Sequence, residues 1–177
     1  MARIRGYIGV SLDGFIADRN EELGWLYEHG GVEYGEFAYE HLLAEVSTMV
    51  MGRATFDWVR KEVAGWVYPD HDSIIVTSHP IENLPPRVTA WTDGVDGLVA
   101  HLRALDGKDV WIVGGGKLQS AFVDRSGLDF IEIFVVPILI GGGTPLWPGS
   151  DVQTVMEFED ARHVNGGVVR LAYRRKT

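Results

Sequence analysis

The sequence predicts a single α/β domain with a mostly parallel central sheet, helices on both faces and an antiparallel hairpin at the C-terminus. Three observations lead to this prediction. Apolar runs alternate with segments of helical periodicity as far as about residue 124, which is typical of parallel strands joined by crossover helices. Beyond that point one strand follows another, and the last two flank the turn signal Asn165-Gly166-Gly167. The 177 residues suit one sizeable core.

The strands are predicted from short apolar runs bounded by turn residues. Ile74-Ile75-Val76 is one such run, and continuous runs of this kind are typical of strands covered on both faces. The predicted strands are Ile4–Val10, Thr48–Met51, Ser73–Thr77, Arg87–Trp91, Asp109–Val113 and Phe130–Ile140, followed by a hairpin of about Thr154–His163 and Val168–Tyr173.

The helices are predicted from apolar residues that recur every three or four positions. Leu98, Leu102 and Leu105 share one face of one such segment. Ala38, Leu42 and Val46 share one face of a second segment. The predicted helices are about Glu33–Val46, Arg53–Arg60, Val95–Leu105 and Lys117–Val123, and the Gly- and Asp-rich stretch from Ser11 to about Val32 is expected to be irregular.

Composition excludes several classes of protein. The net charge of −9 leaves no basic excess to neutralise a nucleic-acid backbone. The chain has no cysteine, which excludes disulfides, thiolate metal ligands and cysteine nucleophiles, and we expect no metal site. No secretory signal precedes Asp13 and no apolar run is long enough to span a membrane. We therefore expect a cytoplasmic protein without a membrane partner.

A run of three glycines, Gly114-Gly115-Gly116, lies between a predicted strand and a predicted helix. A turn without side chains leaves the first backbone N–H groups of the helix and the positive end of its dipole facing one point. A phosphate is a suitable occupant, although a tight turn with no ligand is an equal alternative. The spacing is not Gly-x-Gly-x-x-Gly, so the dinucleotide fingerprint of the doubly wound folds is absent.

Two further strand ends carry groups suited to phosphate. Gly52 follows the second predicted strand, and Arg53 and Thr55 then offer a guanidinium and a hydroxyl. Thr77 and Ser78 end the third predicted strand, where hydroxyls bind phosphate or simply close a turn. Since parallel strands place their carboxyl ends along the same edge of a sheet, the three sites are expected to be neighbours.

In this order the motifs resemble those of the dihydrofolate reductase superfamily, and most closely the reductase domain of the bifunctional riboflavin-biosynthesis deaminase-reductase. The resemblance covers nearly the whole chain and implies a dihydrofolate reductase-like fold. Its motifs are Ile8–Ala17, Met51–Thr55, Val76–Ser78, Val113–Leu118 and Pro137–Leu146. The chain has no cysteine for the zinc site of the deaminase half, so the resemblance implies a stand-alone reductase.

The resemblance implies that the cofactor is NADPH. It implies phosphate contacts from Gly52, Arg53 and Thr55, and contacts to the adenosine 2′-phosphate from Arg53, Thr77 and Ser78. The turn Gly114-Gly115-Gly116 with Lys117 and Leu118 would wrap the pyrophosphate, and Gln119 would lie close to the nicotinamide side. Val10, Ile16 and Ala17 would line the nicotinamide pocket.

Two carboxylates are candidate catalytic residues. Glu36 stands sixteen residues before Gly52, as the substrate-binding carboxylate does in dihydrofolate reductases. Acidic residues are also common in first helical turns because of the helix dipole, which is the alternative explanation for Glu36. Asp13 lies in the loop expected to cover the nicotinamide, although an Asp-Gly pair also simply forms turns.

The expected substrate is a small pterin- or pyrimidine-like heterocycle, and three functions stay open. The first is reduction of the kind that 5-amino-6-(5-phosphoribosylamino)uracil undergoes in riboflavin biosynthesis. The second is dihydrofolate reductase activity, although the usual Trp-x-Leu-Pro pattern does not follow Ala17. The third is a non-enzymatic NADPH-binding sensor. We also expect a homodimer formed through the long apolar strand Phe130–Ile140 and the adjoining Gly141-Gly142-Gly143.

Overall fold

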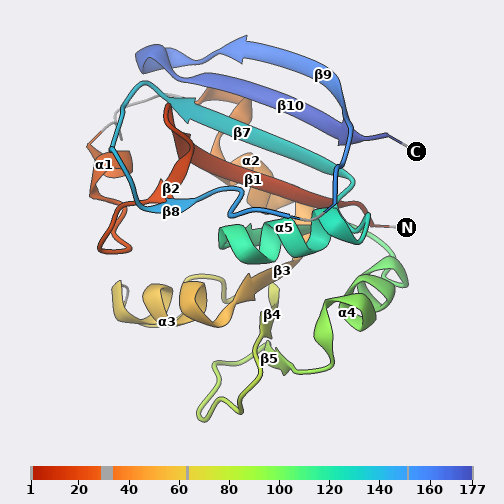
Figure 1. The fold of residues 1–177 in the computed structure, drawn as a ribbon. Coiled ribbons are helices and arrows are strands. Elements are labelled where there is room, and N and C mark those ends of the chain that lie inside the picture. The colour runs from red at the N-terminus through yellow and green to blue at the C-terminus, as the bar shows by residue number, and fades with distance from the viewer. Residues whose placement is uncertain (1, 29–33, 63, 151, 177) are drawn as a thin grey trace.

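The computed structural model describes residues 2–28, 34–62, 64–150 and 152–176. Its central feature is a mixed sheet with the strand order β5-β4-β3-β6-β1-β7-β10-β9 (Figure 1). Strands from β5 to β7 are parallel, and β10 is antiparallel to both β7 and β9. The predicted fold class is confirmed. The strands are β1 (Ile4–Ser11), β3 (Val46–Gly52), β4 (Asp72–Val76), β5 (Val88–Trp91), β6 (Asp109–Gly114), β7 (Phe130–Val136), β9 (Met156–His163) and β10 (Val169–Arg175).

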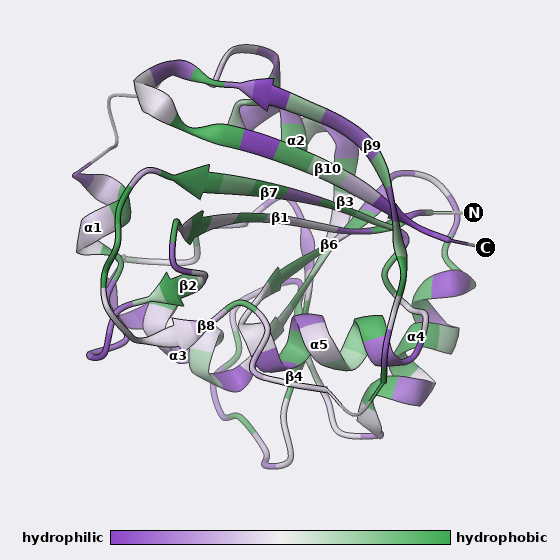
Figure 2. Ribbon diagram, turned by 45° about the horizontal axis from the view of Figure 1, so that its top comes forward, coloured by the Kyte–Doolittle hydropathy of each residue, from purple (hydrophilic) through white to green (hydrophobic). Residues whose placement is uncertain are grey.

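Helices cover both faces of the parallel part of this sheet. Alternation along β3 sends Met49 and Met51 to one face and Val50 to the other, because successive side chains of a strand point to opposite sides. Helices α4 (Gly94–Arg103) and α5 (Gly116–Asp124) pack on the face of Val50. Helices α2 (Tyr39–Glu45) and α3 (Arg53–Glu62) pack on the face of Met49. Both faces are therefore apolar in this region, as Figure 2 shows by the green colour of its strands.

The helix predicted over Glu33–Val46 is wrong in its extent. A short 3₁₀ turn, η1 (Gly35–Phe37), precedes α2, and Ala38 between them is extended, with ψ 150°. Val46 is buried at the start of β3 and belongs to the sheet, so burial in the sheet overrides the helical spacing of its apolar residues. Glu33 lies outside the described residues.

The strand predicted over Phe130–Ile140 is also too long. Strand β7 ends at Val136 because Pro137 follows it and has no N–H to donate to a sheet. The chain then turns back, and a short strand β8 (Thr144–Pro145) pairs with β2 (Phe15–Ala17). Strand β2 and helix α1 (Gly24–Tyr27) lie in the stretch expected to be irregular.

The C-terminal hairpin is confirmed, with β9 and β10 joined through the 3₁₀ turn η2 (Asn165–Gly167). Strand β7 lies between β1 and β10, so both of its edges are already paired. An assembly that adds strands along the edge of β7 is therefore not available. Among the described residues, no helix has the length and apolar character that crossing a bilayer requires.

Candidate functional site

The candidate site lies along one edge of the sheet, where β1, β3, β4 and β6 present their carboxyl ends side by side. We call this the carboxyl edge. Strand β3 ends at Gly52, β4 at Val76 and β6 at Gly114. The structure thus brings the three predicted phosphate motifs to one edge, because β3 is hydrogen-bonded to both β4 and β6.

The glycine turn joins β6 directly to α5. Gly114 ends the strand, a cis peptide links it to Gly115, and α5 begins at Gly116. Gly115 is the N-cap residue and no side chain caps the helix. The first N–H groups of this nine-residue helix therefore have no side-chain acceptor, which leaves donors and a positive dipole end at the carboxyl edge.

Residues from three other elements converge on this turn. A Cβ atom placed on Gly115 would lie 3.8 Å from the Thr55 hydroxyl oxygen and 3.9 Å from Cδ1 of Ile16. A Cβ on Gly52 would lie 3.8 Å from the carbonyl oxygen of Gly114. Side chains at these glycines would fill the space between the strand end and its neighbours. The glycines therefore let the end of β6 and the start of α5 lie close to α3 and β2.

Exposed polar groups lie on the two helices that follow these strand ends. Nε of Arg53 donates to the carboxylate of Asp57 one helical turn later, with distances of 2.8 and 2.9 Å. Both side chains are largely exposed, so this pair contributes little to folding and leaves the guanidinium free to exchange partners. Lys117 is exposed in the first turn of α5.

The end of β4 has a closed turn. The Thr77 hydroxyl donates to the carbonyl of His79 at 3.0 Å and accepts from its N–H at 3.1 Å. Ser78 between them is exposed. Thr77 therefore closes a turn, which is one of the two roles predicted for these hydroxyls. The exposed hydroxyl at this strand end is that of Ser78.

Other predicted cofactor residues are buried. Val10 and Leu118 are 5% and 7% exposed, and Leu118 packs in the core between α5 and the sheet. The Gln119 side chain is fully buried and its amide donates to the carbonyl of Ile112 at 2.9 Å. Gln119 therefore points into the space between α5 and the sheet. Ala17 on β2 is half-buried and pairs with Thr144.

Asp13 lies in a hydrogen-bonded position at the end of β1. Its carboxylate accepts from the Ser11 hydroxyl at 2.6 Å and from the backbone N–H groups of Gly141 at 2.8 Å and Ile140 at 3.3 Å. The hydrogen bond from Ser11, followed by those from the two amides, holds the pKa of Asp13 below its usual range. The group is therefore ionised at neutral pH, which does not suit the donor of a proton.

Glu36 lies elsewhere. It lines a hollow of about 260 Å³ on the face covered by α2, near the amino-terminal half of β1. Arg5, Tyr7 and Phe37 line the same hollow, and the Tyr7 hydroxyl donates to the carbonyl of Phe37 at 2.8 Å. The structure does not bring Glu36 to the glycine turn, and its role as a substrate-binding group stays a prediction.

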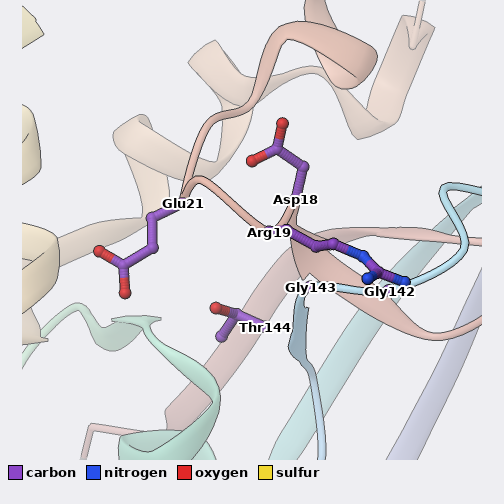
Figure 3. A pocket seen from close by; sticks show the side chains of 6 residues that line it. All are labelled: Asp18, Arg19, Glu21, Gly142, Gly143 and Thr144. Carbon is purple, nitrogen blue, oxygen red and sulfur yellow. The ribbon is translucent and has the colours of Figure 1, made fainter.

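Sequence reasoning missed the contribution of residues 141–146 to this region. A Cβ on Gly116 would meet the carbonyl oxygens of Pro145 and Leu146, the latter at 2.8 Å. Gly142, Gly143 and Thr144 line a second hollow, of about 390 Å³, with Asp18 and Arg19 (Figure 3). The sequence signal for this turn was Pro137 together with Gly141-Gly142-Gly143 a few residues later, which argues against a continuous strand.

Comparison with known proteins gives the family. The RibD C-terminal domain matches residues 4–170. Among curated proteins, Bacillus subtilis (strain 168) "Uncharacterized protein YwjB" is 30% identical over 167 residues, which cover 94% of each chain. "Uncharacterized protein YyaP" of the same organism is 24% identical over 176 residues, covering 94% of this chain and 91% of the relative.

Two solved structures are similar over essentially the whole chain. A "putative riboflavin biosynthesis protein" from Shewanella sp. PV-4 has a TM-score of 0.84 and 27% identity, with full coverage of both chains. The diaminohydroxyphosphoribosylaminopyrimidine deaminase/5-amino-6-(5-phosphoribosylamino)uracil reductase from Thermotoga maritima has a TM-score of 0.73 and 16% identity, covering 99% of this chain and 57% of that one. The second likeness shows the fold alone. On the family match and the shared architecture, this chain belongs to the RibD C-terminal domain family, a family of oxidoreductase domains.

Proposed function

We propose that this protein is an NADPH-dependent reductase that acts on a small pyrimidine- or pterin-like heterocycle, of the same type as 5-amino-6-(5-phosphoribosylamino)uracil reductase. The observation that carries the proposal is the convergence of Gly52, Thr55 and Ile16 on the uncapped start of α5 at Gly115. Family membership supports the reductase class.

The residues present fit the phosphates of such a cofactor. A Cβ on Gly115 would contact Thr55 and Ile16, and the helix N–H groups beside it have no side-chain acceptor. Anions are stabilised at such helix starts. Lys117 and the Thr55 hydroxyl would add a charge and a donor for the pyrophosphate. In a chain of net charge −9, cations placed at this edge favour an anionic ligand locally.

The adenosine end would lie at the ends of β3 and β4. Arg53 can leave Asp57 and bind a 2′-phosphate through its forked donors, and the exposed Ser78 hydroxyl is placed at the neighbouring strand end. NADPH, when bound, supplies the hydride. Ile16 and Ala17 on β2 would then form the apolar wall against the nicotinamide, excluding water from it.

The substrate side is the less defined half of the proposal. The hollow that Glu36 lines with Tyr7 and Phe37 lies near the amino-terminal half of β1, so it is not placed to receive a hydride from a nicotinamide at Ile16 and Ala17. The substrate class is therefore proposed from the family match. Dihydrofolate reductase activity and a sensor that only binds NADPH are the alternatives, and the family favours the riboflavin-type reductase over both.

The first experiment measures NADPH and NADH affinity of the wild type and of Arg53→Ala by fluorescence titration. We expect the wild type to bind NADPH more tightly, and Arg53→Ala to lose about tenfold toward NADPH with little change toward NADH, since one charged hydrogen-bonded contact disappears. Arg87→Ala is the matched control. Arg87 forms a similar exposed pair with Asp72, at an Nε–Oδ1 distance of 3.1 Å, and this pair is not at the glycine turn. A wild type that binds no NADPH would overturn the proposal.

The second experiment follows NADPH absorbance with 5-amino-6-(5-phosphoribosylamino)uracil or dihydrofolate. Oxidation of NADPH in the presence of the uracil compound supports the proposed reaction. Oxidation of NADPH with dihydrofolate only supports dihydrofolate reductase activity. Tight NADPH binding without turnover of either compound favours the sensor.

A further inference from the structure

Asp13 connects two segments that are far apart in the sequence. Its Oδ1 accepts from Ser11 at 2.6 Å and from the N–H of Ile140 at 3.3 Å, and its Oδ2 accepts from the N–H of Gly141 at 2.8 Å. Ser11 is 1% exposed, and its oxygen also accepts from the N–H of Phe15 at 2.9 Å. One carboxylate therefore fixes the loop after β1 and the loop after β7 together.

Further contacts make these loops one unit. The N–H of Leu12 donates to the carbonyl of Ile138 at 2.8 Å, and that of Leu146 donates to Gly14 at 3.0 Å. Strand β2 pairs with β8, and Arg19 donates to the carbonyl of Gly141 at 2.7 Å. Figure 3 shows the Arg19 side chain extended along Gly142. We call residues 11–19 and 138–146 the paired segments.

The paired segments touch the candidate cofactor site at two points. Cδ1 of Ile16 lies 3.9 Å from the position of a Cβ on Gly115. The carbonyl oxygens of Pro145 and Leu146 lie against Gly116 so closely that a Cβ there has no room. The position of the paired segments therefore decides both the wall at Ile16 and the start of α5.

We infer that Asp13 is a positioning residue for the nicotinamide half of the cofactor, and that it acts by fixing the paired segments against the glycine turn. This rests on the proposed NADPH function. Asp13 need not touch cofactor or substrate, since its three donors are all internal to the paired segments. Among the described residues, Arg53 at the adenosine half is hydrogen-bonded to Asp57 and not to either segment, so we expect this half to be independent of Asp13.

The test compares two ligands on the whole protein. One is NADPH, which spans both halves of the site, and the other is 2′,5′-ADP, which carries adenosine with its 2′- and 5′-phosphates and lacks the nicotinamide half. We expect Asp13→Asn to weaken NADPH about tenfold, the size of a lost charged hydrogen bond, and to leave 2′,5′-ADP affinity unchanged. Faster amide hydrogen exchange at residues 138–146 should accompany the loss.

The matched control is Asp18→Asn in the same loop. Asp18 accepts from the N–H groups of Asn20 at 2.7 Å and Glu22 at 2.9 Å, so it closes a turn within residues 18–22. Asp18→Asn should leave the affinity for both ligands unchanged. If Asp13→Asn does not fold, Ser11→Ala removes one donor from the carboxylate and should give a smaller effect of the same selectivity.

The outcomes separate this inference from the proposed function. Wild-type protein that binds neither ligand overturns the proposed function. Wild-type binding of both ligands, with Asp13→Asn unchanged or weakened equally for both, overturns the positioning role and leaves the proposed function intact. Selective loss of NADPH affinity with faster exchange at residues 138–146 supports the inference.

Discussion

The guanidinium of Arg5 on β1 donates a 2.5 Å hydrogen bond to the carboxylate of Glu132 on β7, and both side chains are buried. The other carboxylate oxygen accepts from Arg170 on β10 at 2.7 Å. One glutamate thus joins three neighbouring strands on the face that η1 and α2 cover. Removal of this buried carboxylate is costly, because among the described residues Arg5 then keeps only Glu45 and Asp109, and Arg170 keeps only Asp160.

We predict that Glu132→Gln lowers the free energy of unfolding by about 3 kcal/mol, because it leaves buried positive charge insufficiently paired. Chemical denaturation measures this. Asp72→Asn is the control, since it disrupts an exposed pair with Arg87 and should cost less than about 0.5 kcal/mol. Equal effects of the two substitutions would contradict the importance of the buried network.

Gly116 and Gly52 should respond differently to alanine. At Gly116 a Cβ meets backbone carbonyls, which cannot move aside easily, and we expect a loss of roughly 1–3 kcal/mol in stability. At Gly52 the nearest atom would be 3.8 Å away, so Gly52→Ala should fold normally and lose NADPH affinity. Thermal unfolding and NADPH titration of both variants check this, and normal stability of Gly116→Ala would show that β8 yields.

Alkaline pH should destabilise the protein through Tyr7. Desolvation, the largest cause, raises the pKa of this half-buried tyrosine well above its usual range. A pKa that is higher in the folded state leaves stability intact below the unfolded pKa of about 10 and reduces it as the pH rises further. We expect tyrosinate absorbance and loss of circular dichroism to rise together above about pH 10.

Tyr7→Phe is the informative variant for this prediction. It removes one titrating group, together with the hydrogen bond to Phe37, and should move the alkaline transition to higher pH. Tyrosinate formation in a protein that keeps its circular dichroism would contradict the assignment of the alkaline transition to Tyr7.

We propose a homodimer that packs through the face of β7, β10 and β9 rather than along a strand edge. The register places Val135 beside Val169, Ile133 beside Leu171 and Tyr173 beside Phe158, all on one side of the sheet. Phe158 is 62% exposed. An exposed apolar strip on one face of a sheet can pack on the same strip of a second copy under a two-fold axis.

Phe158→Glu should convert such a dimer to a monomer in light scattering, since it places a charge at the centre of the contact. Tyr27→Glu is the matched control, because Tyr27 is 64% exposed on α1, outside this face. A wild type of monomer mass would refute the proposal.

The sequence by itself determined the alternation of strands and helices, the parallel sheet and the three motifs along the carboxyl edge. These depend on local patterns, namely apolar runs, helical spacing and glycine at strand ends, and each is written within about ten residues of chain. The glycine turn at Gly114-Gly115-Gly116 was found in this way, before any contact was known.

The tertiary structure alone decided where the long segments go. Residues 137–140 are predicted from the sequence as the end of a strand, but the chain turns back there because Pro137 stops β7 and because β2 pairs with Thr144 and Pro145 from far away in the sequence. The same holds for the pairing of Asp13 with Gly141 and of Arg5 with Glu132, each separated by more than a hundred residues. Such contacts depend on which strands become neighbours, and a strand of two or three residues leaves no periodic signal from which to predict them.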